Sequence, residues 1–273
     1  MTQSFRLDGR LAVVGGGRMG EAIVGGLISA GTLSPETITI AEPNADRRAT
    51  LHVTYGVTCV GAGRDAVQDA DVVLLAVKPQ VMDAVVADLS DLLAGTLVVS
   101  IAAGITCARL ESALPAGTPV VRVMPNTPAL VGEGMALISG GSEATVEHVE
   151  LVHALFSAIG KAAVIEEKHQ DAGSAISGSG PAYFALVIDA LARAGVAQGL
   201  SRDVAQALAV QTMRGTAVML EQTGMHPEEL VDGVTSPGGT TIAAINRLES
   251  HGVRSAFAKA VRAAVKRSKE LSA

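Results

Sequence analysis

A glycine-rich turn between a predicted strand and a predicted helix restricts the fold of this chain more than any other feature. A Gly-x-Gly-x-x-Gly motif at 15–20 follows the apolar run 11–14 and opens a helix that reaches residue 30. In such a turn Gly15 permits the tight bend, Gly17 lets a pyrophosphate approach the backbone, and Gly20 lets the helix pack closely on the strand. The motif alone is weak evidence, but its place between strand and helix predicts a dinucleotide site.

The first half of the chain alternates short apolar segments, rich in β-branched residues, with longer alanine-rich segments. This alternation is typical of parallel strands joined by helices that cover the sheet. The predicted strands are 11–14, 37–41, 72–76, 96–101, 119–124, 136–139 and 161–166, and the predicted helices between them are 20–30, 46–55, 79–89, 107–114 and 145–157.

Strand signals fade after about residue 168, and the rest of the chain is predicted to be helical at 180–199, 201–223, 240–251 and 254–271. The sequence therefore predicts an α/β fold, with a Rossmann-type parallel-sheet domain over 1–167 and an all-helical domain over 168–273. Segments 182–196 and 204–220 are apolar on more than one face. They are either central in their own domain or part of a subunit interface, as in a homodimer.

Charge and cysteine content argue against several classes of function. Lysine and arginine number 21 against 27 acidic residues, giving a formal net charge of −6. Nucleic acid is an unsuitable partner for such a chain, because binding its phosphates needs a basic surface. Cys59 and Cys107 are far apart, and neither CxxC nor HExxH occurs, so no metal site is expected. Unpaired cysteines fit the reducing cytoplasm.

No targeting or membrane segment is expected from the sequence. The first eight residues lack the apolar core of a signal peptide, and no uninterrupted run of about 18 apolar residues occurs. These observations predict a cytoplasmic protein that does not cross a membrane.

The acidic residue after the second predicted strand bears on the choice of cofactor. Glu42 lies 22 residues after Gly20, close to the offset of about 20 residues at which a carboxylate binds the adenosine ribose hydroxyls of NADH. Arg47 and Arg48 open the next helix and could instead reach the 2′-phosphate of NADPH, or they could form a solvated helix face. Both cofactors therefore remain open.

Three later stretches break local rules in the way that binding sites do. Val77-Lys78-Pro79 and the rigid segment 124–128 each follow a buried strand, which places them where ligands of open α/β sheets bind. The stretch 235–241, Thr-Ser-Pro-Gly-Gly-Thr-Thr, precedes a helix and offers hydroxyls and amides to an anion. Each stretch alone is more often a turn or a cap, but together they indicate a ligand-binding cleft.

These motifs, with Ser-Gly-Ser-Gly-Pro-Ala-Tyr at 177–183 and Asp-Gly-Val-Thr-Ser-Pro-Gly-Gly-Thr-Thr at 232–241, occur in an order that resembles the pyrroline-5-carboxylate reductases. The resemblance covers essentially the whole chain. It implies NAD(P)H-dependent reduction of 1-pyrroline-5-carboxylate to L-proline by a Rossmann domain and a helical dimerisation domain, with dimers assembled into larger rings.

Motifs and resemblance together assign the site residues. The cofactor, NADPH or NADH, is assigned to Val14, Gly15, Gly16, Gly17, Arg18, Met19, Gly20, Glu42, Val77, Lys78, Pro79, Ala103 and Asn126. The substrate is assigned to Glu167, Ser236, Gly238, Gly239, Thr240 and Thr241. Two departures from the family bear on cofactor preference, because relatives that favour NADPH often carry a small hydroxyl residue in place of Glu42, and some carry Asn in place of Gly63.

The chemistry of a cyclic imine agrees with this assignment. The nicotinamide carries the hydride, so the protein needs to hold the substrate carboxylate and to hydrogen-bond the imine nitrogen. Ser236 and the amides of Gly238, Gly239 and Thr240 suit the carboxylate, while the Thr241 hydroxyl suits the nitrogen and is the candidate catalytic group. The alternative role for Thr241 is a helix cap.

Two other functions compete with this interpretation. A hydroxyacid dehydrogenase of the same two-domain plan would need a lysine on the first long helix of the second domain, and none occurs between residues 180 and 199. A protein that senses dinucleotides without turnover is the other alternative, against which the 235–241 stretch argues.

Overall fold

The structure, a computed structural model, describes residues 9–272. The first eight residues, where the sequence shows no signal-peptide core, lie outside the described residues. The chain divides into two compact units: the first holds residues up to Ser179 and those from Ala264 on, and the second is Gly180–Ala263. Within the first unit, the Ser268 hydroxyl of the C-terminal segment donates a hydrogen bond to Asp171 (2.7 Å). The boundary at 167/168 differs from this division and stays a prediction.

The first unit contains a single sheet, and its strand order is that of a dinucleotide-binding fold. The eight strands follow the order β3-β2-β1-β4-β5-β6-β7-β8, in which the first six reproduce the doubly wound 3-2-1-4-5-6 arrangement. The Rossmann-type fold is thus confirmed. The strands are β1 (Leu11–Val14), β2 (Ile38–Ala41), β3 (Thr58–Val60), β4 (Val72–Leu75), β5 (Leu97–Ser100), β6 (Val120–Met124), β7 (Gly134–Gly140) and β8 (Gly160–Val164).

One strand pair departs from the parallel sheet that the sequence predicts. β7 is antiparallel to β6, with Val123 opposite Ile138, whereas β7 and β8 are parallel. The reason is the length of the connections. β6 and β7 are joined by a short segment with only the 3₁₀ turn η4 (Thr127–Val131), too short for a parallel crossover, while a full helix joins β7 to β8.

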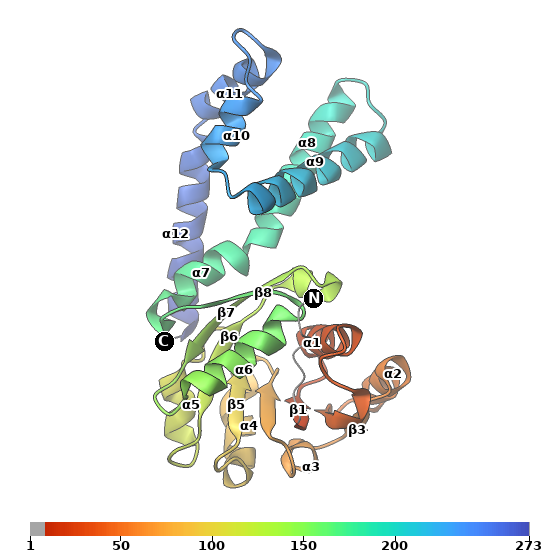
Figure 1. The fold of residues 1–273 in the computed structure, drawn as a ribbon, viewed down its shortest axis with the longest axis vertical. Coiled ribbons are helices and arrows are strands. Elements are labelled where there is room, and N and C mark those ends of the chain that lie inside the picture. Colours follow the sequence, from red (N-terminus) through yellow and green to blue (C-terminus); the bar gives the residue numbers. More distant parts are fainter. Residues whose placement is uncertain (1–8, 273) are drawn as a thin grey trace. The chain divides into compact units, whose positions relative to one another are not determined.

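Helices cover both faces of this sheet (Figure 1). Those of the first unit are α1 (Arg18–Ser29), α2 (Ala45–Tyr55), α3 (Gly63–Val67), α4 (Met82–Leu89), α5 (Cys107–Ala113), α6 (Val146–Ser157) and α7 (Gln170–Ser177), with 3₁₀ turns η1 (Pro35–Thr37), η2 (Pro79–Val81), η3 (Ser90–Leu92) and η5 (Glu167–His169). The helices of the second unit are α8 (Gly180–Ala197), α9 (Arg202–Thr223), α10 (Pro227–Gly233) and α11 (Thr240–Ser250), followed by α12 (Val253–Ser272), which continues into the first unit.

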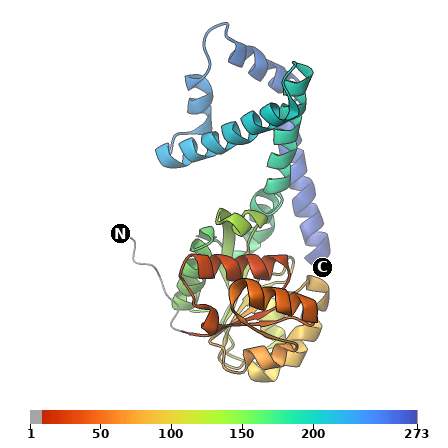
Figure 2. The same ribbon diagram turned by 90° about the vertical axis from the view of Figure 1, so that its right-hand side faces the viewer.

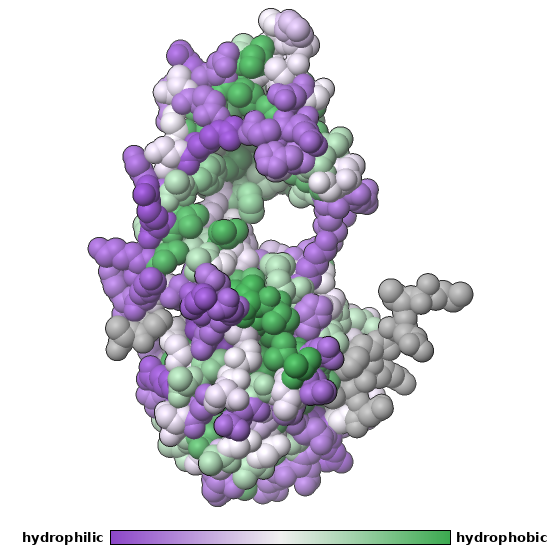
Figure 3. Space-filling model, turned by 60° about the vertical axis from the view of Figure 1, so that its left-hand side comes forward, coloured by the Kyte–Doolittle hydropathy of each residue, from purple (hydrophilic) through white to green (hydrophobic). Residues whose placement is uncertain are grey.

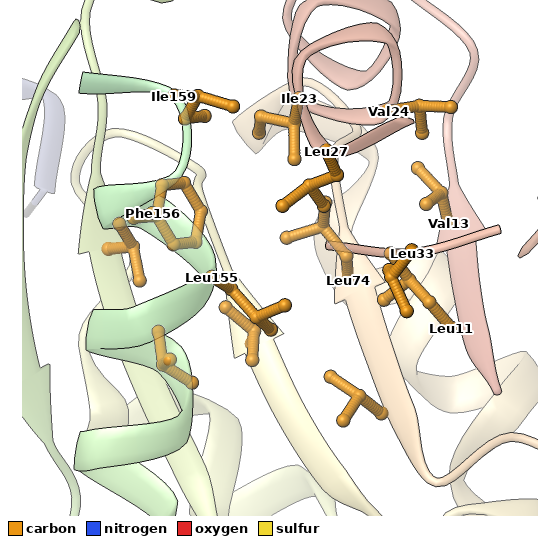
Figure 4. Packing of buried hydrophobic residues seen from close by; sticks show 14 of the residues in the cluster. Leu11, Val13, Ile23, Val24, Leu27, Leu33, Leu74, Leu155, Phe156 and Ile159 are labelled. Carbon is orange, nitrogen blue, oxygen red and sulfur yellow. The ribbon is translucent and has the colours of Figure 1, made fainter. Parts of the chain in front are cut away.

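Alternation along the strands supplies a core to each face. In β1, Leu11 and Val13 point to one face, where α1, α2 and α6 pack, and Ala12 and Val14 point to the other, where α3, α4 and α5 pack. Figure 4 shows the first core, with Leu27 of α1 packed among side chains of the sheet. In Figure 2, α1 and α2, red and orange, lie on the same face. Strands buried on both faces explain the continuous apolar runs of the sequence.

The sequence interpretation missed β3, α3, α7 and α10. β3 has only three residues, none of them buried, so it lacks the apolar run that identifies the other strands. α3 is about a turn and a half, and α7 contains one glycine and two serines within eight residues. Short elements of this kind are held by their neighbours in the fold rather than by their own residue pattern.

The second unit buries little apolar surface within one chain. In α8 and α9 the buried residues are Gly180 and three alanines, Ala192, Ala205 and Ala209, whereas Phe184 and Leu186 are 57% and 70% exposed. Figure 3 shows apolar side chains, in green, reaching the molecular surface. The helical stretch Glu167–Ala197 is also long and apolar enough to pass a length and composition test for membrane-crossing helices, which the sequence interpretation did not expect. Helices whose apolar face is covered by another subunit pass the same test.

The two-sided core predicts a large effect for truncation of a buried side chain in α1. Leu27 is 1% exposed, so Leu27→Ala should lower the free energy of unfolding by about 2–5 kcal/mol, because it removes buried methyl groups and leaves a cavity. Urea unfolding followed by circular dichroism measures the change. Val53→Ala, at a position that is 84% exposed, is the control and should change it by less than about 0.5 kcal/mol. Equal effects of the two variants would contradict this account of the core.

Candidate functional site: the carboxyl edge of the sheet and the 235–241 loop

Backbone hydrogen bonds tie together the loops that follow neighbouring parallel strands. Gly15 donates to Ala41 (2.9 Å), Ala76 to Val14 (2.9 Å) and Ile101 to Leu75 (3.2 Å). The loops after β1, β2, β4 and β5 therefore lie side by side along the carboxyl edge of the sheet, where open α/β folds bind their ligands. Most residues assigned to the cofactor belong to these loops.

Glycine occupies each of the three motif positions for a different physical reason. Gly15 has φ +113°, and a Cβ there would lie 2.7 Å from the Ala76 carbonyl oxygen. A Cβ on Gly20 would collide with the Gly15 carbonyl oxygen, so glycine allows α1 to start close to the strand. By contrast, a Cβ on Gly17 would meet nothing within 4 Å. Gly17 is thus not required by packing, and it leaves an open approach to the backbone at the start of α1.

The Glu42 carboxylate holds the glycine-rich loop against the end of β2. Its two oxygens accept hydrogen bonds from the amides of Gly16 (3.1 Å) and Asn44 (3.0 Å). A carboxylate offers about four acceptor positions, so two bonds leave capacity for ribose hydroxyls. Glu42 therefore combines a position suited to the adenosine ribose with a role in shaping the loop.

The two arginines of α2 have partners within the protein. Arg47 donates to the Gly16 carbonyl (2.9 Å) and forms an ion pair with Glu21 (2.5 Å), so it braces the glycine-rich loop. Arg48 donates through Nη1 to the carbonyls of Glu42 and Pro43, both at 2.8 Å. Both arginines keep guanidinium nitrogens without a hydrogen bond in the described structure: Nη1 of Arg47, and Nε and Nη2 of Arg48. Binding of a 2′-phosphate by Arg47 or Arg48 stays a prediction.

A cavity of about 260 Å³ opens beside Glu42's strand and the first glycine. Its walls are mainly apolar and come from the ends of β1, β2 and β4 and from α4. Gly15, Gly61 and Gly63 line it, as does the side chain of Val77. An apolar slot of this size next to a carboxylate fits an adenine ring, and the open side of Gly17 fits a pyrophosphate. The residues present therefore fit a dinucleotide.

The remaining cofactor residues fall into two groups. Arg18, Lys78 and Ala103 are exposed at the carboxyl edge, where their backbone and side chains are accessible. Asn126 is 8% exposed, and its side-chain amide makes two hydrogen bonds within the protein. Oδ1 accepts from the Met135 backbone amide (2.8 Å), and Nδ2 donates to the Ser177 carbonyl (2.9 Å). Its side chain therefore fixes the turn after β6, and a cofactor contact by Asn126 stays a prediction.

The structure places Glu167, which the resemblance assigns to the substrate, in a network of the first unit. Its Oε1 accepts from the Cys107 amide (2.8 Å) and from Arg122 Nη1 (3.1 Å). Burial, with the nearby Glu167 charge second, raises the pKa of the Cys107 thiol to about 12, so this thiol stays protonated and unreactive. Sequence reasoning missed Arg122, although an arginine inside the apolar strand Val-Val-Arg-Val-Met is a recognisable signal.

The other substrate residues, Ser236, Gly238, Gly239, Thr240 and Thr241, lie together in the second unit at the start of α11. Gly238 has φ +69°, and the Gly239 amide donates to the Ser236 carbonyl (3.0 Å). The Gly239 amide is thus already hydrogen-bonded in this conformation, and its contact with a substrate carboxylate stays a prediction. The first amides of α11, from Thr240 on, have no partner within the helix.

Thr241 does not cap α11. The N-cap is Gly239, no side chain caps the helix, and no hydrogen bond of the Thr241 hydroxyl occurs in the described structure. The alternative role of Thr241 as a helix cap thus finds no support. Within residues 9–272 no cluster of three or more potential metal ligands occurs either.

Comparison with known proteins agrees with this arrangement. A family model described as pyrroline-5-carboxylate reductase dimerisation matches residues 167–271, and one described as NADP oxidoreductase, coenzyme F420-dependent, matches residues 10–104. The pyrroline-5-carboxylate reductase of Synechocystis sp. is 46% identical over 96% of this chain and 98% of its own length. The chain belongs to the pyrroline-5-carboxylate reductase family.

Solved structures of this family share the fold. A pyrroline-5-carboxylate reductase from Coxiella burnetii superimposes with a TM-score of 0.93 at 37% identity, covering 98% of this chain and 100% of the other. The Plasmodium falciparum pyrroline carboxylate reductase, solved with NADP bound, gives a TM-score of 0.89 at 30% identity over 98% of this chain and 100% of the other.

The open space at Gly17 generates a sharp prediction. Gly17→Val should weaken NADPH and NADH binding by at least about tenfold, because the side chain fills the approach of the pyrophosphate, while the thermal midpoint stays close to wild type. Fluorescence titration of the reduced cofactor measures binding. Gly17→Ala, which adds a single carbon in the same place, should show a smaller effect. Unchanged affinity in the valine variant would refute the dinucleotide assignment.

Glu42 generates a second prediction. Glu42→Ser should raise the ratio of kcat/KM with NADPH to that with NADH by about tenfold, because it removes a carboxylate that repels a 2′-phosphate. Loss of the hydrogen bond from the Gly16 amide should also weaken the binding of both cofactors. The exposed Glu36→Ser is the control, with no expected change in the ratio. If the ratio stays constant in Glu42→Ser, the carboxylate does not face the ribose.

Proposed function

We propose that the protein catalyses the NAD(P)H-dependent reduction of 1-pyrroline-5-carboxylate to L-proline, the last step of proline biosynthesis. The observation that carries this proposal is family membership along the whole length, with 46% identity to a pyrroline-5-carboxylate reductase over 96% of the chain. The fit of a dinucleotide to the carboxyl edge supports it independently.

NADPH or NADH, when bound, supplies the hydride that reduces the imine carbon. The chain's own residues position the cofactor and the substrate and polarise the imine. Gly15 to Gly20 and Glu42 hold the dinucleotide, with Val77 to Pro79 and Ala103 contributing from the neighbouring loops. Holding both reactants in line can supply about 7–11 kcal/mol of barrier reduction, so a site without a strong acid is sufficient.

The 235–241 loop is proposed to hold the substrate. Its anion would be bound by the Ser236 hydroxyl and by the free amides at the start of α11, where the helix dipole favours negative charge. The Thr241 hydroxyl would donate a hydrogen bond to the imine nitrogen as the hydride arrives. Because this hydroxyl has no hydrogen bond within residues 9–272, it needs to break none of those in order to do so.

The two rival functions fare differently. A hydroxyacid dehydrogenase is disfavoured by family membership and by the absence of a lysine from α8. A sensor without turnover would share the cofactor site but would not need the free Thr241 hydroxyl, and an activity assay separates it from an enzyme.

Assembly and location complete the proposal. We place the protein in the cytoplasm as a homodimer, with dimers assembled into a larger ring, and with neither membrane nor nucleic acid as partner. The match of residues 167–271 to a dimerisation model supports the dimer. It also accounts for the apolar stretch Glu167–Ala197, whose exposed side chains a second copy would cover.

The decisive experiment combines turnover with one variant. Wild-type protein supplied with 1-pyrroline-5-carboxylate should oxidise NADPH or NADH, followed by absorbance, and Thr241→Ala should lower kcat by about tenfold or more with unchanged cofactor affinity. Thr241→Ser should recover much of the rate. Thr216→Ala removes an exposed threonine hydroxyl from α9 and serves as the control. A wild-type rate in Thr241→Ala would show that the hydroxyl has no part in the reaction.

A further inference from the structure

The carboxylate of Glu167 joins three elements of the first unit. Glu167 begins η5, directly after β8, and its Oε1 accepts from the amide of Cys107 at the start of α5 and from the guanidinium of Arg122 on β6. One oxygen atom thus links the segment after β8 to a helix and to the sheet interior.

The charge of Glu167 is matched to a buried cation. The Arg122 side chain is only 7% exposed, whereas that of Glu167 is 28% exposed. A guanidinium removed from water to this extent is costly unless an anion pairs with it, and Glu167 provides that anion. Loss of the charge would therefore disturb Arg122 and the elements around it.

The backbone that carries Glu167 is itself fixed. Gln170, 1% exposed, donates to the Leu137 carbonyl (3.2 Å) and to the Ser139 hydroxyl (2.9 Å), which in turn donates to the Ile165 carbonyl (2.8 Å). These bonds on both sides of Glu167 hold η5 against β7. A carboxylate on so constrained a segment is suited to hold another part of the fold in place.

The part that Glu167 holds is the loop between β5 and α5. The loop begins beside β4, where the Ile101 amide donates to Leu75 (3.2 Å), and it ends at Thr106, which caps α5 by accepting from Arg109. Its exposed residue is Ala103, and the loop follows β5, which pairs with the β4 strand that precedes Val77. β4 fixes the first end of this loop, and the hydrogen bond from the Cys107 amide to Glu167 anchors the other end.

We propose that Glu167 is a positioning residue for the cofactor: with Arg122 it fixes the start of α5, and thereby the loop 101–106 against the dinucleotide, and it makes no contact with substrate. The inference rests on the proposed function for the identity of the cofactor, and it replaces the substrate role that the family resemblance implies for this residue.

The test measures binding of each reactant in Glu167→Gln. This substitution keeps the shape and an acceptor for Cys107 but removes the charge that pairs with Arg122. The Kd of NADPH, titrated by fluorescence without substrate, should rise by about tenfold, while the KM for 1-pyrroline-5-carboxylate at saturating cofactor should stay within about twofold. The reverse pattern, a raised substrate KM with unchanged cofactor Kd, would overturn the proposal. So would a lower thermal midpoint with both constants unchanged, because the role would then be structural only.

Neighbouring variants supply the controls. Glu166→Gln alters the adjacent, exposed carboxylate, which pairs with Lys168, and should change neither constant. Arg122→Met should also raise the Kd of NADPH. The double variant should raise this Kd no more than the more affected single variant does, because both substitutions remove the same interaction. Additive losses would contradict a shared role. Since the cofactor Kd is measured without substrate, failure to turn over 1-pyrroline-5-carboxylate would refute the proposed function and would still leave the effect of each variant on cofactor Kd measurable.

Discussion

The rest of the first unit depends on a sheet that is covered on both faces. Each strand sends alternate side chains to opposite cores, so β1 packs against α1 through Val13 and against the α3–α5 face through Val14. Buried parallel strands have no polar face to give to a ligand. Polar chemistry is therefore displaced to the ends of the strands, and the hydrogen-bonded loops of the carboxyl edge become the place where a dinucleotide can be bound.

Those loops are held by charged side chains that bond to backbone. Glu42 accepts from the Gly16 amide and Arg47 donates to the Gly16 carbonyl, so the two peptide groups that flank the Gly16 Cα are both held. At the start of α5, Glu167 accepts a hydrogen bond from the Cys107 amide. A glycine-rich segment has much conformational entropy to lose on folding, and fixing it in advance reduces what cofactor binding has to supply.

The strands and long helices were predictable because each repeats a simple pattern. The strands of the sheet other than β3 follow apolar runs, and α1 follows the glycine motif. β3 and α7 were not predicted, because the residues of β3 are not buried and those of α7 are interrupted by glycine. The reversed direction of β7 depends on the length of the connection before it. The partners of Arg47, Asn126 and Glu167 were not predictable, because these contacts join residues far apart in the chain. The shape of the 235–241 loop, in which Gly239 uses its own amide, depends on a turn that residue types alone do not define.

In the second unit, unlike the first, small side chains are buried and large apolar ones are exposed. Its long helices α8 and α9 pack through small residues, with Gly195 so close to Ala205 that an added Cβ would lie 3.1 Å from the Ala205 Cβ. Small contacts of this kind bring the helix backbones together but bury little apolar area, while large side chains such as Phe184, Leu186 and Leu208 remain exposed. Hydrophobic burial contributes about 25 cal/mol per Å², so the contact between α8 and α9 within one chain gains little from it. Within one chain α8 and α9 thus place small residues inside and large ones outside, which is why their segments were apolar on more faces than one core requires.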